Sequence, residues 1–204
     1  MVRNKEMGEI MRQESQQKIL QAARTIFASR GFFNCKVSDI AQEADMSQGN
    51  VYYYYSSKED ILKAVLQDGF QSLEDAFMAA EAFPGDGRQK IDHLLDQFIC
   101  FCREQSDFMF IFLSLLGHGG LTFLSQMGFN TLEMGAGFHQ HVNAIFSQAD
   151  SEGILLVQDL NQIAVFFFSF FNGLMITYSQ DWEELVPEEQ LRQGIYRLLG
   201  IQSN

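Results

Sequence analysis

The stretch SQGNVYYYYSSKED, from Ser47 to Asp60, gathers side chains that recognise other molecules by contact. Gln48 and Asn50 are amides, which can make two hydrogen bonds to the edge of adenine. Four successive tyrosines follow, and each phenol is a flat apolar ring whose hydroxyl can donate to a phosphate. Gly49 has no side chain, so its backbone can approach a ligand closely. The chemistry that this stretch offers is recognition of a base, sugar or phosphate.

Two other pairs of reactive side chains have a spacing that argues against a metal site. Cys100 and Cys102, like His139 and His141, are two residues apart, and on a helix such residues do not face each other. Neither pair has a second pair to complete a ligand set, so ordinary packing is the better interpretation. The sequence also lacks a glycine-rich phosphate loop, a nucleophile elbow and an HExxH motif. We therefore expect no metal, no cofactor and no enzymatic activity.

Helices are predicted on both sides of this stretch, and they must position it. The first should begin near Ser15 and end at Gly31. Its apolar stripe comprises Ile19, Ala22, Ala23, Ile26 and Phe27. A second, short helix reads VSDIAQEA and is broken at DMS, after which Ser47 suits the N-cap of a third helix. A capping box of Ser56 and Glu59 then begins a fourth helix. Two short helices joined by a brief turn form a helix-turn-helix unit.

The four tyrosines cannot share one face of the third helix, because successive side chains turn by about 100°. Val51 and Tyr55 are one turn apart and are expected to pack inward. Tyr52, Tyr53 and Tyr54 should spread over the remaining surface. The alternative, in which all four rings belong to the core or to ordinary surface, fits Tyr55. It does not fit the other three, because one short helix cannot bury three consecutive rings.

The remainder of the chain favours an all-α protein, since 47% of residues are apolar and only 2 are proline. Helical spacing continues after a turn at Pro84 to Gly87 and recurs up to a last helix that follows Pro187. The most apolar run, from Ile163 to Tyr178, has 16 residues, which is short of the roughly 20 needed to cross a membrane. We expect a helix buried on two faces, one of them against the same helix of a second subunit.

Charge is distributed unevenly along the chain. Residues 1–63 hold 9 Lys and Arg against 8 Asp and Glu, whereas residues 64–204 hold 5 against 18. Phosphate contacts need basic side chains, so only the front of the chain is suited to nucleic acid. The 3 cysteines form no disulfide framework, and the chain opens with a polar, charged segment rather than a secretory signal. We expect a cytoplasmic protein that does not enter a membrane.

The segment ILQAARTIFASRGFFNCKVSDIAQEADMSQGNVYYYYSSKEDIL resembles the DNA-binding domain of the tetracycline-repressor (TetR) family of bacterial regulators. The motifs that match are IL.AA..IFA..GF, V..IA.EA and S.G.VY.YY.SKE.IL, with their spacing. The resemblance implies an all-α homodimer with two N-terminal three-helix heads on operator DNA. A C-terminal domain would bind a small hydrophobic effector and form the dimer. It thus implies a repressor that its effector releases from the operator.

Site residues follow from the resemblance position by position. Gln48 and Asn50 match base-reading positions, Tyr52 matches a phosphate contact, and Lys58 would favour a phosphate at the start of the fourth helix. The full expected DNA-binding set is Lys36, Ser38, Ser47, Gln48, Gly49, Asn50, Tyr52, Tyr53, Tyr54 and Lys58. Two departures from the family pattern stand out. Cys35 and Lys36 replace usual hydroxyl residues, so Lys36 would act as a point charge, and Asp45 occupies a turn position where glycine is usual.

The predicted domains are residues 1–63, with a flexible N-terminal arm over 1–14, and residues 64–204, which would bind the effector and form the dimer. Candidate pocket residues are Phe98, Cys102, Phe112, Met127, Phe138, His141 and Phe171, with His141 as the polar contact. Candidate dimer-interface residues are Phe166, Phe170, Gly173 and Leu198. The alternative hypothesis is a helical lipid- or acyl-binding protein or enzyme in which the DNA-binding domain is unused.

Overall fold

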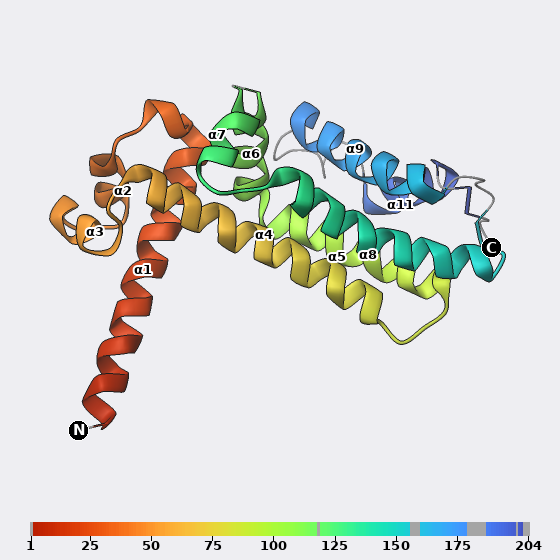
Figure 1. Ribbon diagram of the computed structural model, residues 1–204, viewed down its shortest axis with the longest axis horizontal. Helices are drawn as coiled ribbons and strands as arrows, with labels where there is room; N and C mark the ends of the chain where they lie inside the picture. Colours follow the sequence, from red (N-terminus) through yellow and green to blue (C-terminus); the bar gives the residue numbers. More distant parts are fainter. Residues whose placement is uncertain (1, 118, 156–159, 179–186, 199, 202–204) are drawn as a thin grey trace.

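The computed structural model describes residues 2–117, 119–155, 160–178, 187–198 and 200–201. The fold is all-α, as predicted: helices account for the regular structure of the described residues, and one isolated antiparallel bridge joins Leu155 to Ile201. A small group of helices lies at one end of an elongated bundle (Figure 1). We call the small group, α1 to α3 with the first turn of α4, the head, and the remaining helices the body.

The head is formed by α1 (Val2–Arg30), the 3-10 helix η1 (Phe32–Asn34), α2 (Val37–Glu43) and α3 (Gln48–Tyr54). All five residues of the predicted stripe on α1 are buried, which confirms the helical spacing read from the sequence. Asp45, in the turn between α2 and α3, has a φ of 53°, so the backbone is left-handed where the family usually has glycine. The helix-turn-helix unit is therefore present, with Asp in the strained position.

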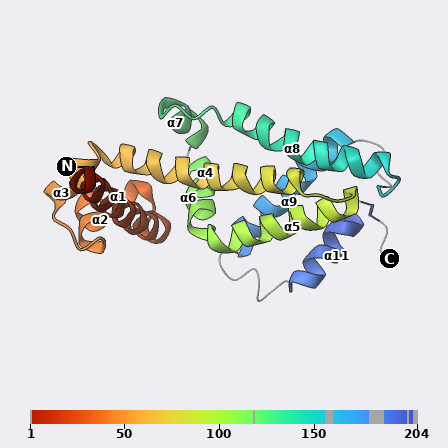
Figure 2. The same cartoon turned by 90° about the horizontal axis from the view of Figure 1, so that it is seen from below.

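The expected start of α1 near Ser15 is wrong, because the helix begins at Val2. Residues 2–14 are rich in Glu, Met, Gln and Arg, which favour helix, and Gly8 alone does not break it. The side chains from Met7 to Glu14 are exposed, and this part of α1 extends away from the rest of the molecule (Figures 1 and 2). The N-terminal arm is thus a continuation of the first helix.

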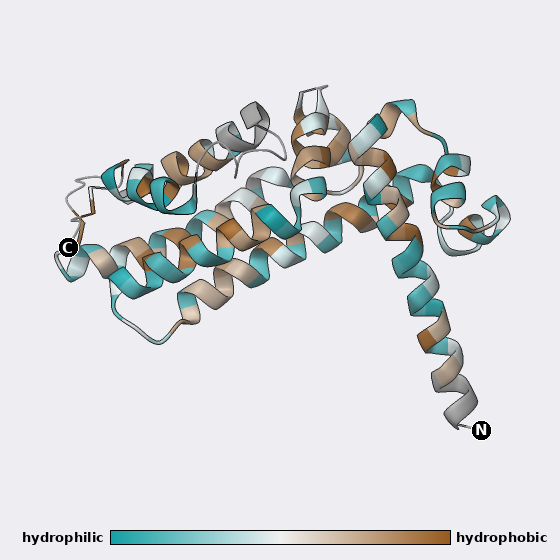
Figure 3. Ribbon diagram, turned by 180° about the vertical axis from the view of Figure 1, so that it is seen from behind, coloured by the Kyte–Doolittle hydropathy of each residue, from teal (hydrophilic) through white to brown (hydrophobic). Residues whose placement is uncertain are grey.

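The body is built from α4 (Lys58–Ala82), α5 (Gly87–Glu104), α6 (Ser106–Leu116), α7 (Gly120–Gln126), α8 (Thr131–Ser151), α9 (Leu160–Tyr178) and α11 (Glu188–Leu198). Helix α4 starts in the head and continues along the body, where it packs against α5 and α8 (Figure 2). Apolar and polar residues alternate along the long helices (Figure 3), as expected of helices with one buried face. The sequence did not predict α7 as a separate helix.

Close helix packing in the body depends on small residues and on aromatic rings. A Cβ atom added at Gly87 would lie 2.4 Å from Ala149 Cα, so α5 and α8 can approach this closely only because residue 87 is glycine. Phe98 is buried, and its ring centroid lies 5.7 Å from that of Phe77 and 4.4 Å from that of Phe171. These rings join α5 to α4 and α9 and fix the body as one packed core.

Polar and aromatic contacts connect the head to the body. Arg24 of α1 donates a hydrogen bond of 2.6 Å to Gln105 Oε1, next to the start of α6, and forms an ion pair with Asp68 of α4. Phe123 of α7 packs against Phe32 and Phe33 of η1, with centroid distances of 5.5 and 5.6 Å. Helices α6 and α7 therefore link the bundle to the head.

No single helix within the described ranges combines the length and apolar character of a membrane span. Helices α6 and α7 pass on length and composition only as a pair, and they are bent by 108° at the break between them.

Candidate nucleic-acid interface and apolar cavity

Helix α3 is a short helix that is anchored in the head chiefly by Val51 and exposes most of its other side chains. Val51 is fully buried, whereas Gln48, Gly49 and Asn50 are exposed. Ser47 caps the helix as predicted, since its hydroxyl accepts a 3.1 Å hydrogen bond from the Asn50 backbone N–H. The two amides and the glycine between them are thus presented together on a capped, anchored helix.

The four tyrosines divide into two groups. Tyr52 is 47% exposed and Tyr53 is 74% exposed, so both rings are available to a partner. Tyr54 is half-buried and packs against the core, so the prediction that its ring lies on the open surface is only partly correct. Its ring meets the Tyr53 ring edge-on, with the centroids 5.0 Å apart. Tyr55 leaves the helix as its C-cap and packs inward, as predicted, and burial, followed by the charge of Asp68, raises its pKa.

Lys36 and Ser38 lie at the start of α2, and both are exposed. The Lys36 backbone N–H donates a 2.7 Å hydrogen bond to Asp39, whose other oxygen lies 3.2 Å from Arg30 Nη1. A carboxylate in the first turn of α2 caps the helix in place of the usual hydroxyl residue. The Lys36 ammonium and the Ser38 hydroxyl thus remain on the outer surface of the head.

The structure does not place Lys58 as a ligand for phosphate. Its ammonium donates hydrogen bonds of 2.6 and 2.8 Å to the backbone oxygens of Phe32 and Cys35, and it lies 4.4 Å from the Phe32 ring centroid. Lysine is long enough to reach back across the head, where its ammonium hydrogen-bonds to the two backbone carbonyls and lies over the Phe32 ring. The N-cap of α4 is Ser57, which accepts from the Asp60 N–H, so the predicted cap at Ser56 is wrong by one residue.

An apolar cavity of about 190 Å³ lies in the body among α4, α5, α6, α8 and α9. Its apolar lining consists of Phe70, Leu73, Phe98, Phe108, Met109, Phe112, Met134, Phe138 and Phe168. The other lining residues are Thr131, Gly135, His139 and Asn172. Pockets of this kind, apolar with a few polar groups, are typical of small-molecule sites.

Phe98, Phe112 and Phe138 line this cavity, as the sequence analysis proposed. Four other candidates do not line it, and they are Cys102, Met127, His141 and Phe171. Cys102 and Phe171 are buried in the core, where burial raises the Cys102 pKa to about 12. Met127 is half-buried against the core, beyond the cavity. The helical spacing located apolar positions but could not tell which of them border an unfilled space.

His141 has a structural partner instead of a ligand. Its Nδ1 lies 2.5 Å from Glu81 Oε2 and its Nε2 lies 3.1 Å from Glu74 Oε1, so it connects α8 to α4. Burial opposes protonation of His141, but hydrogen bonds to the two carboxylates outweigh burial and raise its pKa. The polar histidine of the cavity is His139, whose ring centroid is 5.0 Å from that of Phe168. The described residues contain no group of three or more His, Cys, Asp or Glu able to hold a metal ion.

Comparison with known proteins agrees with this geometry. Residues 19–65 match the family model described as bacterial regulatory proteins, tetR family. The chain carries a TetR-family DNA-binding domain. A curated HTH-type transcriptional regulator, YfiR of Bacillus subtilis, is 37% identical over 54 residues, which is 26% of this chain and 26% of that protein. The similarity in sequence to this relative is thus confined to about a quarter of its length.

Solved structures extend the likeness to the whole fold. The TetR family transcriptional regulator PfmR from Thermus thermophilus superposes with a TM-score of 0.74 at 20% identity, over 91% of this chain and 96% of that one. The ketosteroid transcriptional regulator KstR2 of Mycobacterium tuberculosis gives 0.75 at 15% identity, over 93% and 95%. At these identities the likeness establishes the fold of the body, and the TetR-type head and body occur in one chain.

An exposed apolar face lies on α9 and α11 of this TetR-type body. Phe166 is 59% exposed and Leu198 is 64% exposed, while Phe170 is half-buried and Gly173 is exposed. The opposite stripe of α9 is buried in the core as predicted, with Ile163, Phe167 and Phe171 all inward. The predicted Leu174 and Tyr178 of that stripe have side chains outside the described set. The second apolar face of α9 is therefore open in a single chain.

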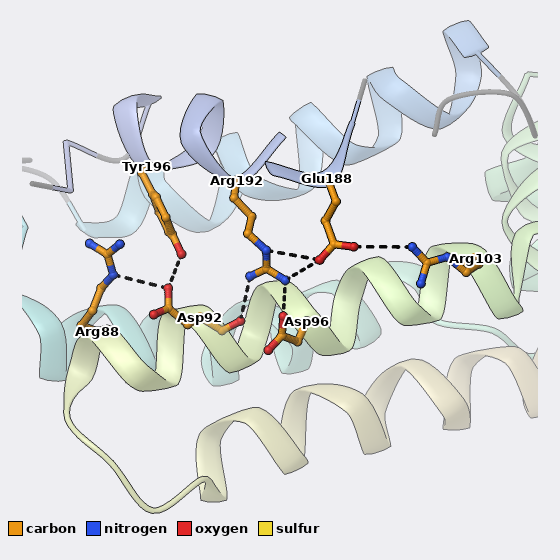
Figure 4. Close-up of polar contacts among 7 residues, drawn as sticks. All are labelled: Arg88, Asp92, Asp96, Arg103, Glu188, Arg192 and Tyr196. Carbon is orange, nitrogen blue, oxygen red and sulfur yellow. Dashed lines mark hydrogen bonds and ion pairs between the residues drawn. The ribbon is translucent and has the colours of Figure 1, made fainter. Parts of the chain in front are cut away.

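Helix α11 is attached to α5 by a network of charged and polar side chains (Figure 4). Arg192 donates a 2.9 Å hydrogen bond to Glu188 Oε1 and pairs with Asp96. Tyr196 donates to Asp92 from the next turn of α11. This network supports one edge of the exposed apolar face of the TetR-type body, because Leu198 lies on the same helix.

Proposed function

We propose that the protein is a sequence-specific DNA-binding transcriptional regulator of the TetR type, acting in the cytoplasm as a homodimeric repressor. The observation that carries the proposal is the α3 surface. Gln48, Asn50, Tyr52 and Tyr53 are exposed together on a helix whose buried Val51 anchors it in the head. Amides can read adenine, and the phenols can contact phosphate, sugar or a thymine methyl. A regulator without enzymatic activity needs only such contacts.

The apolar face of α9 and α11 supports the homodimer. Exposed apolar residues that adjoin one another mark interaction surfaces, and Phe166, Phe170 and Leu198 border one shallow hollow. A second copy of the same face would bury these rings in a symmetric interface. Two heads would then be held at a fixed separation, as two half-sites on DNA require.

The cavity supports control by a small lipophilic effector. Phe108, Met109 and Phe112 of α6 line it, and the other side of α6 contacts α1 of the head. An effector that displaces α6 would disturb the contact between Arg24 and Gln105 and so move the head. The effector would release the operator to the extent that it binds the displaced state more tightly.

The test is binding to the DNA immediately upstream of the protein's own gene, measured by fluorescence anisotropy over a salt series. We expect binding that resists competitor DNA and weakens as salt rises. Tyr53→Ala is the matched variant, since the ring is exposed and its loss should weaken binding without unfolding the head. Absence of specific binding across genomic fragments, together with tight binding of an apolar ligand, would favour the alternative of a lipid- or acyl-binding protein.

A further inference from the structure

The wall of the cavity carries no charged carboxylate, ammonium or guanidinium group among its described residues. Six of the lining residues are phenylalanines, contributed by α4, α5, α6, α8 and α9. The polar lining groups are Thr131, His139 and Asn172. Such a wall can hydrogen-bond to a hydroxyl or carbonyl, but it offers no lysine or arginine to a carboxylate or phosphate.

The open groove beside the cavity makes an anionic ligand still less suitable. Phe70, Met134 and Phe138 line both the cavity and this groove, so they separate the two spaces. The groove also carries Glu74 and Glu133, and its described lining holds no basic residue. An anion that approached along the groove would meet like charge, and one that entered the cavity would be desolvated with no lysine or arginine to pair with it among the described lining residues.

Two of the three polar groups, His139 and Asn172, lie near Phe168, whereas Thr131 lies apart from them at the start of α8. His139 packs on the Phe168 ring, and Asn172 follows Phe168 by one turn of α9. Thr131 lies eight positions before His139 on α8, about 12 Å away along the helix axis. Most of the intervening wall is formed by aromatic rings, which prefer to pack against other rings in edge-on or offset arrangements.

The size of the cavity favours a compact molecule. Its volume of about 190 Å³ is close to the roughly 150 Å³ of an engineered apolar cavity that binds benzene. Sites for drug-sized ligands start at about 300 Å³. A ligand of one or two fused rings fits this volume, whereas an extended acyl chain does not fit within it.

We propose that the cavity selects an uncharged, compact aromatic molecule with one hydrogen-bonding group, such as a phenol, and rejects carboxylates and long acyl chains. The proposal deepens the proposed function and depends on it, since the same cavity would bind the effector.

A matched pair of probes tests whether the cavity prefers an uncharged ligand to a carboxylate. A naphthol and the corresponding naphthoate have the same ring system, and decanoate represents an acyl chain. Isothermal titration calorimetry on the full chain should give naphthol binding at least about tenfold tighter than naphthoate binding, because the described lining offers a buried carboxylate no lysine or arginine. Equal or tighter binding of naphthoate or decanoate overturns the proposal. Absence of naphthol binding at millimolar concentration also overturns it.

Two glycines of α8 provide matched variants that locate the site. A Cβ atom added at Gly135 or at Gly137 would meet no atom within 4 Å, so both positions have room for a side chain. Gly135 lines the cavity and Gly137 lines only the outer groove. Gly135→Leu should abolish naphthol binding while Gly137→Leu retains it, with thermal unfolding of both variants as a check on folding. Equal binding by the two variants would place the ligand elsewhere and overturn the proposal.

Operator binding separates failure of this inference from failure of the proposed function. If naphthol binds the cavity but does not change DNA binding, the ligand class stands and the regulatory role of the cavity fails. If the protein binds operator DNA but the naphthoate is preferred, the DNA-binding function stands and the ligand class fails.

Discussion

The Phe108 ring lies directly over Gly69, and a Cβ atom at residue 69 would be 2.1 Å from Phe108 Cδ2. Glycine at this position of α4 is therefore what allows α6 to pack so close. Because Phe108 also lines the cavity, its ring is a shared boundary between the helix that leads to the head and the space proposed for the effector.

Gly69→Ala should force the Phe108 ring to move, since real Cβ contacts do not occur at that distance. We expect a loss of about 1–3 kcal/mol in the free energy of unfolding, as is usual for overpacked cores, and altered ligand binding. Urea unfolding and calorimetry measure these effects. Gly194→Ala is the control, because its Cβ would meet nothing within 4 Å. Equal stability of the two variants would contradict the close packing described here.

Tyr53→Ala and Tyr54→Ala should separate DNA contact from stability. Tyr53 is 74% exposed, so its loss should weaken operator binding with little change in Tm. Tyr54 packs against the core, so its loss should lower the free energy of unfolding by about 1–3 kcal/mol. Fluorescence anisotropy measures the operator binding of both variants, and thermal unfolding measures their stability. Tyr52→Phe, which removes only a hydroxyl, should weaken binding while the fold is retained.

His141→Gln should reduce stability at low pH more than at high pH. The pKa of His141 is raised in the folded state, so the stabilisation from its ion pairs with Glu81 and Glu74 is complete below the unfolded pKa of about 6.5. That stabilisation is lost as pH rises through the folded pKa, which lies above this value. We expect a difference on the order of 1 kcal/mol near pH 6 that shrinks by about pH 9.

Urea unfolding of the wild type and the variant at both pH values measures this difference. If the difference in unfolding free energy between wild type and His141→Gln grew as pH rises, the predicted direction of the pH dependence would be wrong. The partners of His141 are the Glu74 and Glu81 carboxylates, both from α4.

Phe166→Glu should convert the proposed dimer to a monomer without unfolding the chain. The ring is 59% exposed in one chain, so a charge there is tolerated in a monomer but not in an apolar interface. Light scattering coupled to size-exclusion chromatography distinguishes one 23.3 kDa chain from two. Gln140→Glu, at an exposed position of α8, controls for the added charge. An unchanged dimer would exclude this face as the interface.

Arg192→Ala should loosen α11 from α5. Its guanidinium contacts Asp96 and Glu188, and hydrogen bonds to charged groups contribute about 1.5–3 kcal/mol. The lower end is expected here because both carboxylate side chains are about half exposed. Hydrogen exchange of the α11 amides and the Tm report the loss. Arg197→Ala, at an exposed residue of the same helix, should change neither.

The sequence was sufficient for the fold class and for most of the head, because short-range signals determine both. The stripe on α1, the Ser47 cap and the buried Val51 depend on periodicity and local hydrogen bonding. Asp45, with a φ of 53°, stands where the resemblance to the TetR family implies a turn position usually held by glycine. These features need no knowledge of how distant segments meet.

The errors concern side chains whose place depends on such distant segments. Lys58 reaches backbone oxygens that precede it by 23 and 26 residues. His141, which was predicted to be the polar contact of the cavity, is bound to carboxylates of α4, and the histidine that lines the cavity is His139. The geometry of one isolated helix puts Tyr54 on the surface, but the neighbouring core covers part of its ring. Helical spacing gives the direction of a side chain and does not give what lies opposite.

Helix α4 is a single helix of 25 residues that begins in the head and ends at the far end of the bundle. At 1.5 Å per residue it forms a lever about 37 Å long. A tilt of about 5° about its body end would displace the head by about 3 Å. In a dimer the two levers would swing in opposite senses, so the separation of the heads would change by up to about 6 Å against a half-site spacing of about 34 Å. A ligand of only one or two rings would therefore need to tilt α4 by only about 5° to take the two heads out of register with DNA.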